Sequence, residues 1–254
     1  MNILQKIFIT TEAKYCVACK RKLCKDKFFI SNNSAGICNE CSSKISFTKY
    51  GSSFEAREPL QYVLSPMEYK GSIVTILKEF KFNSRFINGD IVNLILKDFL
   101  KHYPQLYDFD YVIPVPLSRE RFNERGFNQS EKLAKGIGQA LSLPLDTTSL
   151  TRVRNTPRQS QFSYAERIKN VKDAFHAEHT LINKKIILVD DIYTTGCTMS
   201  SCASALIEAG ALSVIGLSAS IVIPSVYRPA LRPVPKPLLK CRSFKQIKNH
   251  FKYR

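Results

Sequence analysis

The sequence contains no apolar run that approaches the ~18 residues needed to span a membrane. Its first stretch, residues 1–14, lacks the basic and then apolar layout of a secretory signal. We therefore expect a cytoplasmic protein without a transmembrane segment. In that compartment, the eight cysteines of the 254-residue chain are expected to be metal ligands or free thiols rather than disulfide partners.

Acidic residues are scarce relative to basic ones. The chain has 38 Lys and Arg residues against 21 Asp and Glu residues, which gives a formal charge of +17. A charge of one sign and that size attracts polyanions, such as nucleic acid, an anionic membrane or phosphorylated substrates. The length and the hydrophobic content of 44% suit one α/β domain with a small accessory module.

The most informative stretch lies at residues 186–198. Four apolar residues, 186–189, predict a short strand buried on both faces in the middle of a parallel sheet. Asp190 and Asp191 follow at the end of the strand where ligands bind in open α/β sheets. A loop of small hydroxyl residues and a helical pattern over residues 199–209 come next, and such a helix start favours a phosphate. The predicted phosphate loop consists of Thr194, Thr195, Gly196, Cys197 and Thr198.

The two acids indicate what the phosphate is attached to. Carboxylates accept hydrogen bonds from vicinal hydroxyls, so Asp190 and Asp191 suit the ribose of a ribose 5-phosphate. Both acids reach one sugar only if the strand ends at Asp190, because successive strand residues point to opposite faces. The alternative is a pair of acids that merely end a strand before an ordinary turn. The whole run, however, resembles the phosphoribosyl pyrophosphate (PRPP) motif of type I phosphoribosyltransferases.

A second group of basic residues follows another predicted strand. Residues 111–117 form this strand, and its two prolines are expected at its exit because they cannot donate to a ladder. Arginines beside the end of a strand suit a second phosphate, although a solvated basic loop is the alternative. A polar loop at residues 154–161 could close over a polyphosphate. The candidate phosphate ligands of these segments are Arg119, Arg121, Arg125, Arg158 and Arg167.

Two Cys-x-x-Cys pairs near the N-terminus predict a zinc site. Eighteen residues separate the pairs, a spacing expected of a closed, structural four-cysteine site, with a small ribbon around residues 28–30 between them. Cys24 is an alternative ligand without an x-x-Cys partner. Nearby lysines could offset the thiolates, contact nucleic acid or only solubilise the module. The expected ligands are Cys16, Cys19, Cys38 and Cys41.

The segment between the zinc module and the sheet has a weak pattern, and we interpret residues 46–68 as a linker. Two core-facing helices are expected next. The first follows the Tyr69-Lys-Gly sequence, and the second runs over residues 89–103.

The order of these motifs resembles the ComF family of competence proteins. The resemblance rests on the two Cys-x-x-Cys pairs, Pro-Val-Pro-Leu from Pro114, Arg-Gly-Phe-Asn-Gln from Arg125, Thr-Pro-Arg-Gln from Thr156, and the acid pair, over roughly residues 14–222. It implies a phosphoribosyltransferase domain behind a zinc finger, with a role in natural transformation. Asp190 and Asp191 would be the catalytic acids, with Mg²⁺ bound together with PRPP.

The C-terminal stretch, residues 224–254, departs from that family pattern. It has nine basic residues, five prolines and no acid, which predicts a flexible basic arm. Such an arm binds nucleic-acid phosphates, and its aromatic residues can stack on unpaired bases, whereas a solubilising tail is the alternative. The expected nucleic-acid contacts are Arg242, Lys245, Lys248 and Lys252.

The sequence thus predicts an α/β protein with an open, mostly parallel sheet flanked by helices. Its expected parts are a zinc module (1–45), a linker (46–68), a phosphoribosyltransferase-like domain (69–223) and a basic tail (224–254). We expect a competence protein that handles incoming single-stranded DNA and has a pocket for PRPP or another ribose 5-phosphate. DNA-uptake or recombination proteins are candidate partners, with a peripheral position at the inner membrane near the uptake channel as an option. The alternative is an active phosphoribosyltransferase that uses an unidentified nitrogen acceptor.

Overall fold

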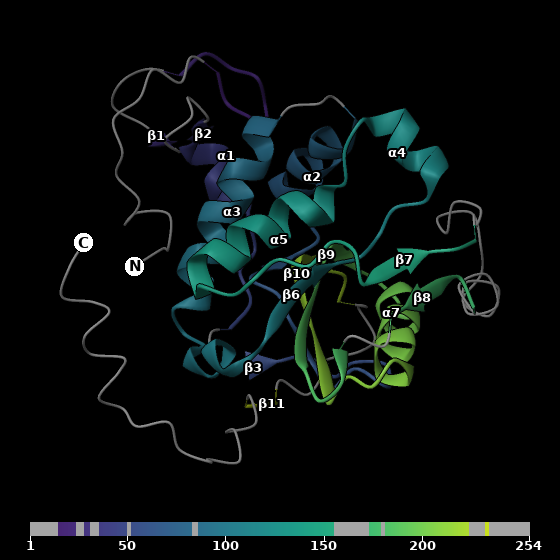
Figure 1. The fold of residues 1–254 in the computed structure, drawn as a ribbon. Coiled ribbons are helices and arrows are strands. Elements are labelled where there is room, and N and C mark those ends of the chain that lie inside the picture. Colours follow the sequence, from purple (N-terminus) through teal and green to yellow (C-terminus); the bar gives the residue numbers. More distant parts are fainter. Residues whose placement is uncertain are drawn as a thin grey trace.

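A computed structural model gives the fold (Figure 1) and describes residues 15–23, 28–30, 36–49, 52–82, 86–154, 173–178, 181–223 and 232–233. Its centre is a parallel sheet with the strand order β4-β10-β9-β6, in which β5 also pairs with β10. The strands are β4 (Val63–Leu64), β5 (Met67–Glu68), β6 (Tyr111–Pro114), β9 (Lys185–Tyr193) and β10 (Ser213–Ile221). The predicted open parallel sheet is confirmed.

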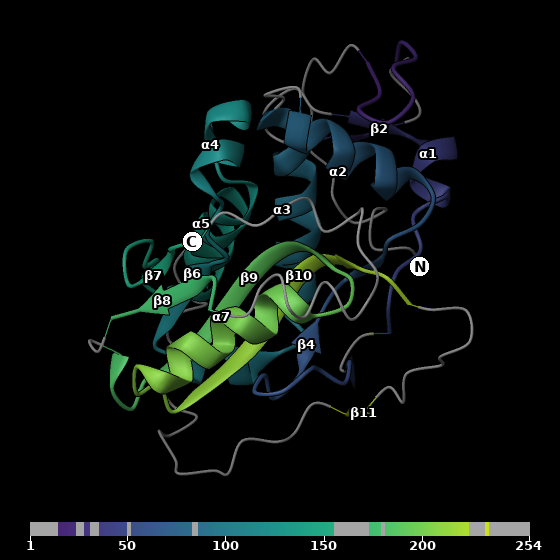
Figure 2. The same ribbon diagram turned by 90° about the vertical axis from the view of Figure 1, so that its right-hand side faces the viewer.

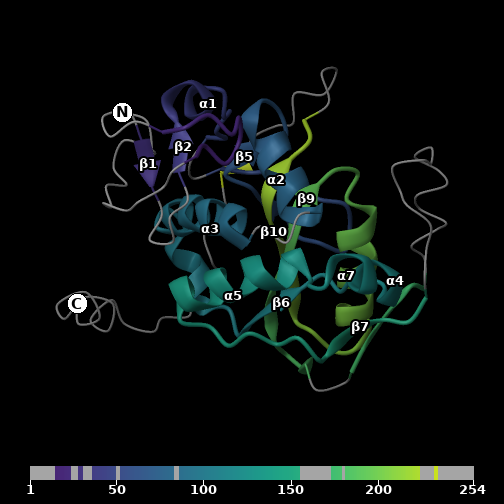
Figure 3. The same ribbon diagram turned by 90° about the horizontal axis from the view of Figure 1, so that it is seen from above.

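Helices cover both faces of this sheet. Helices α2 (Ser72–Phe82), α3 (Phe86–Leu100) and α5 (Gln129–Leu141) lie on one side, and α7 (Cys197–Glu208) lies on the other (Figure 3). Residues of β9 alternate between the two layers. Ile187 and Val189 belong to the core that includes α2, α3 and α5, whereas Ile186 and Leu188 belong to the core that includes α7. This alternation explains why the run at residues 186–189 is apolar at every position.

The first predicted core helices are close to their expected places. Helix α3 begins at Phe86 and ends at Leu100, three residues earlier at each end than expected, and a 3₁₀ helix, η2 (Pro104–Asp108), follows it. Pro104 cannot continue an α-helix because its ring removes the backbone N–H donor. Tyr103, at the N-cap of η2, is fully buried and packs against Phe99 with tilted rings, whose centroids are 4.6 Å apart.

Three small antiparallel pairs surround the main sheet. Strands β1 (Phe28–Ile30) and β2 (Gly36–Cys38) form the expected ribbon between the cysteine pairs, and α1 (Asn39–Ser43) follows it. Strands β7 (Leu150–Arg152) and β8 (Phe175–Ala177) pair beside α7. Strand β3 (Ser52–Ser53) pairs with β11 (Arg232–Pro233), so two residues of the expected flexible arm take part in a ladder.

The interpretation of residues 46–68 as a linker is wrong. Val63 and Leu64 pair with Gly216 and Leu217 of β10, and β5 pairs further along the same strand. Both β4 residues are fully buried. Paired stretches of two residues are too short to show a periodic pattern, so no strand could be predicted there from the sequence.

Two local expectations also need correction. Strand β9 continues through Tyr193, because β10 pairs with it as far as Ile221, so the strand does not end at Asp190. The arginine segment after β6 is a helix, α4 (Arg119–Arg125), and not a loop. Ser118 caps this helix by accepting a hydrogen bond from the backbone N–H of Arg121 (3.3 Å), and Gly126 ends it with a left-handed φ of 74°.

Candidate phosphoribosyl pocket

The pocket lies where β6 stops and β9 continues. The last ladder contact of β6 places Pro114 opposite Val189, and the N–H of Val115 still donates to the Val189 carbonyl (2.8 Å). Pro116 has no N–H to extend the ladder. In the described part of the chain, the next four residues of β9 have a neighbouring strand on the β10 side alone. The open side faces a cavity of about 530 Å³.

Asp190 is fixed by two hydrogen bonds. Its Oδ1 accepts from the Ser130 hydroxyl (2.9 Å) at the start of α5 and from the backbone N–H of Asp191 (2.8 Å). Asn128 anchors that helix start to β6, because its Nδ2 donates to the Val115 carbonyl (3.0 Å) and its Oδ1 accepts from the Ser130 N–H (3.0 Å). The end of β6, the start of α5 and the acid pair therefore form one connected unit.

The two acids leave β9 on opposite faces, as an unbroken strand requires. Asp191 is buried and forms an ion pair with Lys81 of α2, with 2.7 Å between Lys81 Nζ and Asp191 Oδ2. Both carboxylates nevertheless line the cavity. Both acids reach one pocket because the pocket lies beside the open edge of β9. The strand therefore does not have to end at Asp190 for the two carboxylates to face the same ligand.

Burial, and to a lesser degree the charge of Asp191, raise the pKa of Asp190 from 3.8 to about 6, against the lowering effects of Lys81 and of the hydrogen bonds from Ser130 and the Asp191 N–H. Between those two values the folded protein holds a proton that the unfolded chain has released. The carboxyl therefore contributes stability that declines as the pH rises through this window.

Asp190→Asn should remove this pH dependence, because the amide stays neutral and can keep the hydrogen bond from Ser130. We expect urea unfolding to show a free energy of unfolding that falls less steeply with rising pH in the variant than in the wild type, between pH 3.8 and about 6. Parallel profiles for the two proteins would contradict the raised pKa.

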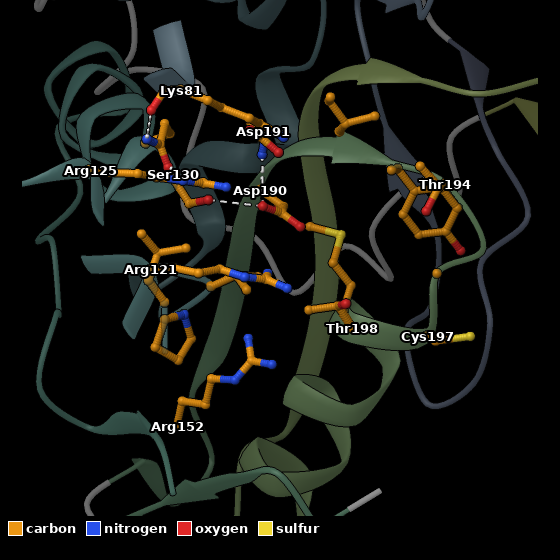
Figure 4. A pocket seen from close by; sticks show the side chains of 18 of the residues that line it. Lys81, Arg121, Arg125, Ser130, Arg152, Asp190, Asp191, Thr194, Cys197 and Thr198 are labelled. Atoms are coloured by element: carbon orange, nitrogen blue, oxygen red, sulfur yellow. Dashed lines mark hydrogen bonds and ion pairs between the residues drawn. The ribbon is translucent and has the colours of Figure 1, made fainter. Parts of the chain in front are cut away.

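The predicted phosphate loop lies across the cavity from Arg121, Arg125 and Arg152, with the acid pair between the loop and these arginines (Figure 4). Gly196 takes a left-handed φ of 76° as the N-cap of α7, and an added Cβ would lie 2.3 Å from the Tyr193 hydroxyl oxygen. A side chain here would be strained by the left-handed φ and would displace the Tyr193 ring, so the loop favours glycine. Thr194, Gly196, Cys197 and Thr198 line the cavity. The Thr195 hydroxyl lies 3.2 Å from the Cys197 sulfur, and Thr195 is not among the lining residues.

The arginines of α4 divide between the pocket and the surface. Arg121 and Arg125 line the cavity, and Arg125 Nη1 donates to Gln129 Oε1 (2.9 Å). Arg119 is exposed and is not among the lining residues. Arg158 and Arg167 lie outside the described residues, as do Arg242, Lys245, Lys248 and Lys252.

Sequence reasoning missed several lining residues, because they come from distant segments. Lys78 and Lys81 lie on α2, Ser130 is the second residue of α5, and Arg152 is the last residue of β7. The Arg152 guanidinium lies 5.3 Å from the centre of the Phe175 ring, and burial and the charge of Arg121 lower its pKa. Only one sequence signal pointed to any of them, the position of Ser130 just after the Arg-Gly-Phe-Asn-Gln motif.

The charges around the cavity favour a polyanion. Among the described residues that line it, five are basic and two are acidic. The basic residues are Lys78, Lys81, Arg121, Arg125 and Arg152. A cavity with both a basic group and an acid pair suits a ligand that combines phosphates with hydroxyl groups.

The four predicted zinc ligands meet at one point. The sulfurs of Cys16, Cys19, Cys38 and Cys41 all lie within 4.8 Å of one another, and 3.8 Å separates those of Cys19 and Cys38. Zn–S bonds of about 2.3 Å in a tetrahedron place sulfurs about 3.8 Å apart. Backbone N–H groups of Cys19 and Cys38 point to the Cys16 sulfur at 3.5 and 3.4 Å. The cluster could therefore hold zinc, and Cys24 lies outside the described residues.

The fold and pocket define a phosphoribosyltransferase-like domain behind a four-cysteine module. In agreement, the family model described as "Phosphoribosyl transferase domain" matches residues 126–250. The chain belongs to the ComF family.

The relatives that carry this assignment resemble most of the chain. The "DNA utilization protein YhgH" of Salmonella typhimurium is 32% identical over 159 residues, which cover 61% of this chain and 70% of that protein. The "Competence protein ComFC" of Bacillus subtilis is 29% identical over 207 residues, which cover 78% of this chain and 80% of that protein. A solved purine phosphoribosyltransferase from Pyrococcus horikoshii is 17% identical to this chain, and the match covers 60% of this chain and 92% of the solved one. Its TM-score is 0.31, so the family assignment does not rest on this structure.

Within the described segments, no helix has the length and apolar character to cross a membrane.

Proposed function

We propose that this chain is a cytoplasmic competence protein that handles single-stranded DNA and binds PRPP in the pocket beside β9. The observation that carries the PRPP proposal is that Asp190 and Asp191 line one cavity together with the Gly196 loop and five basic side chains. Figure 4 shows the acid pair between the labelled threonines of that loop and the three arginines. PRPP carries a 5-phosphate at one end of its ribose and a pyrophosphate at the other. The acid pair would hold the ribose between two anion-binding regions.

Each part of the ligand has a matching group. The backbone N–H groups that begin α7 favour the 5-phosphate, helped by the hydroxyl of Thr198. Arg121, Arg125 and Arg152 would bind the pyrophosphate. The carboxylates supply the oxygen ligands that Mg²⁺ prefers, so the residues fit a magnesium ion that enters with the ligand. When bound, Mg²⁺ would neutralise charge on the pyrophosphate.

Ligand fragments test this division of the pocket. PRPP with Mg²⁺ should raise the thermal unfolding temperature more than ribose 5-phosphate or pyrophosphate does at the same concentration, because a ligand that binds only the folded state stabilises it according to its affinity. Equal stabilisation by pyrophosphate and PRPP would show that the ribose is not recognised.

The second candidate is an active phosphoribosyltransferase, which the family match to a phosphoribosyl transferase domain favours. The C1–O bond to pyrophosphate would break while a C1–N bond to the acceptor forms, with the arginines stabilising the leaving group. Pyrophosphate release from PRPP, measured with and without single-stranded DNA and above the Asp190→Ala/Asp191→Ala blank, separates a transferase from a binder. Release that requires DNA would point to the strand as acceptor.

The DNA proposal rests on charge and on the family. Relatives carry the names of competence and DNA-utilization proteins, and the chain has a net charge of +17. The stretch 224–254 supplies nine basic residues without any acid. We place the phosphate contacts on Arg242, Lys245, Lys248 and Lys252, with DNA-uptake or recombination proteins as partners.

Deletion of residues 234–254 should weaken DNA binding and flatten its dependence on salt. The deletion retains β11, and each phosphate contact that is lost reduces the slope of log affinity against log salt by about 0.7 for a single strand. Fluorescence anisotropy with a labelled oligonucleotide at several salt concentrations measures the slope. An unchanged slope would make this segment a solubilising tail.

A further inference from the structure

Helix α2 lies between the cysteine module and the pocket. The cysteine module consists of the described residues 15–23 and 36–45, which hold the four-cysteine cluster. Figure 2 shows α2 between α1 of this module and α4 of the pocket wall. The 11 residues of α2 span about 16 Å, enough to connect the two regions with one rigid element.

Lys20 contacts α2 from the module side. It follows Cys19, and its Nζ donates to the Val17 carbonyl (2.7 Å) and forms an ion pair with Glu79 of α2. The backbone of Lys20 has a φ of 64°, in the left-handed region where a side chain is disfavoured and glycine is the usual choice. Because glycine would suit this backbone conformation better, the geometry of the turn does not explain why a lysine is present. What the lysine provides is its side-chain contact with α2.

The module and α2 also share one hydrophobic core. Cys16, Ile37 and Ile45 belong to the same buried cluster as Ile73 and Ile76 of α2. Just before α2, Gly71 packs so closely on the module that an added Cβ would lie 2.0 Å from the Lys44 carbonyl oxygen. The module therefore fixes the start of α2, and Lys20 contacts its last turn through Glu79.

The opposite side of α2 meets the acid pair. Lys81 lies two residues after Glu79, about 200° around the helix, so it faces away from the module. Its ammonium pairs with Asp191 at 2.7 Å, and its carbonyl oxygen accepts a hydrogen bond from Gln129 Nε2 (3.4 Å). Phe80 packs on Phe127, with ring centroids 5.7 Å apart. The position of α2 thus decides where the Lys81 charge stands relative to Asp191.

We propose that Lys20 is a positioning residue, which acts through Glu79 and α2 to hold Lys81 against Asp191 and so sets the affinity of the pocket for PRPP. This inference rests on the proposed PRPP function. With α2 displaced, the Lys81 charge no longer offsets that of Asp191, and the acid pair repels the phosphates of the ligand more strongly. The four-cysteine module is then part of the pocket wall and not a separate finger.

The variant Lys20→Gly separates positioning from folding. Glycine relaxes the left-handed backbone and removes the side-chain contact with Glu79. If the lysine served only the turn, zinc retention and thermal stability would be unchanged or improved, and PRPP affinity would not change. We expect zinc content to stay the same, PRPP affinity to fall about fivefold by calorimetry, and amide hydrogen exchange over residues 72–82 to become faster. The matched control is Lys22→Gly, an exposed lysine of the same segment, which should change none of these.

If Lys20→Gly also disturbs the metal site, reversal of the charges of the Lys20–Glu79 ion pair tests the positioning role instead. Lys20→Glu and Glu79→Lys should each weaken PRPP binding, and the double variant should recover most of the lost affinity, because the ion pair is restored in reverse. Wild-type affinity in Lys20→Gly, or no recovery in the double variant, would overturn the inference. Wild-type protein that does not bind PRPP at all would instead contradict the proposed function.

Discussion

Replacement of both Asp190 and Asp191 by alanine is expected to weaken PRPP binding at least about 100-fold. The acids would accept hydrogen bonds from the ribose hydroxyls, and hydrogen bonds to charged groups contribute about 1.5–3 kcal/mol each. Losing two such contacts corresponds to about 3–6 kcal/mol, and 2.7 kcal/mol already equals a factor of about 100. Calorimetric titration of the zinc-loaded double variant with PRPP and Mg²⁺ measures the loss.

The same double variant should bind free pyrophosphate differently from PRPP, because removal of the acids has an electrostatic effect that opposes the loss of the ribose contacts. The double variant keeps all five basic side chains of the cavity and loses both acids, so the attraction of the pocket for free phosphates increases. In a water-filled pocket this gain is about 1 kcal/mol, which is smaller than the loss of the ribose contacts. Pyrophosphate alone should therefore bind as well as before or better. A parallel loss of PRPP, pyrophosphate and DNA binding in a folded variant would mean that the sites are not separate.

The second large effect is expected at the cysteine cluster. Cys41→Ala removes a buried ligand, and a structural zinc ion contributes its binding free energy to folding. Because the module shares its core with α2 and α3, we expect the loss to reach the whole domain. Loss of the metal with several kcal/mol of stability should lower the thermal unfolding temperature by about 10 °C. Differential scanning calorimetry with zinc determination on the same sample measures both quantities.

Cys202→Ala is the matched control. Cys202 is fully buried on α7 and lies outside the four-cysteine cluster, so its replacement removes a buried thiol without touching the metal ligands. This control should keep one zinc ion per chain and show only the small loss of a filled core position. Equal zinc content in both variants would refute the assignment of Cys41 as a ligand.

The sequence predicted the parts of the fold that depend on local patterns. The apolar run at residues 186–189 indicated a central strand, and the Thr-Thr-Gly sequence after it indicated the turn into α7, where the φ of Gly196 is 76°. The spacing of the cysteine pairs predicted a cluster that the structure brings together. Each of these features is encoded within a few adjacent residues, or in a spacing that one metal ion dictates.

Tertiary contacts explain what the sequence did not show. The short strands β4 and β5 are stabilised by the long strand β10, and their own residues give no periodic signal. Lys81 and Arg152 enter the pocket from segments far from the acid pair in sequence, and only the packing of α2 and β7 brings them there. Arg119 and Arg121 looked equivalent in the sequence, but on α4 the first is exposed and the second lines the cavity.

The most direct test of the central proposal is an equilibrium titration of the zinc-loaded wild-type chain with PRPP and Mg²⁺. We expect saturable binding at one site per chain, competition by ribose 5-phosphate, and loss of the signal in the Asp190→Ala/Asp191→Ala variant. Protein that retains its zinc and its cooperative unfolding transition but shows no saturable binding of PRPP would contradict the proposal.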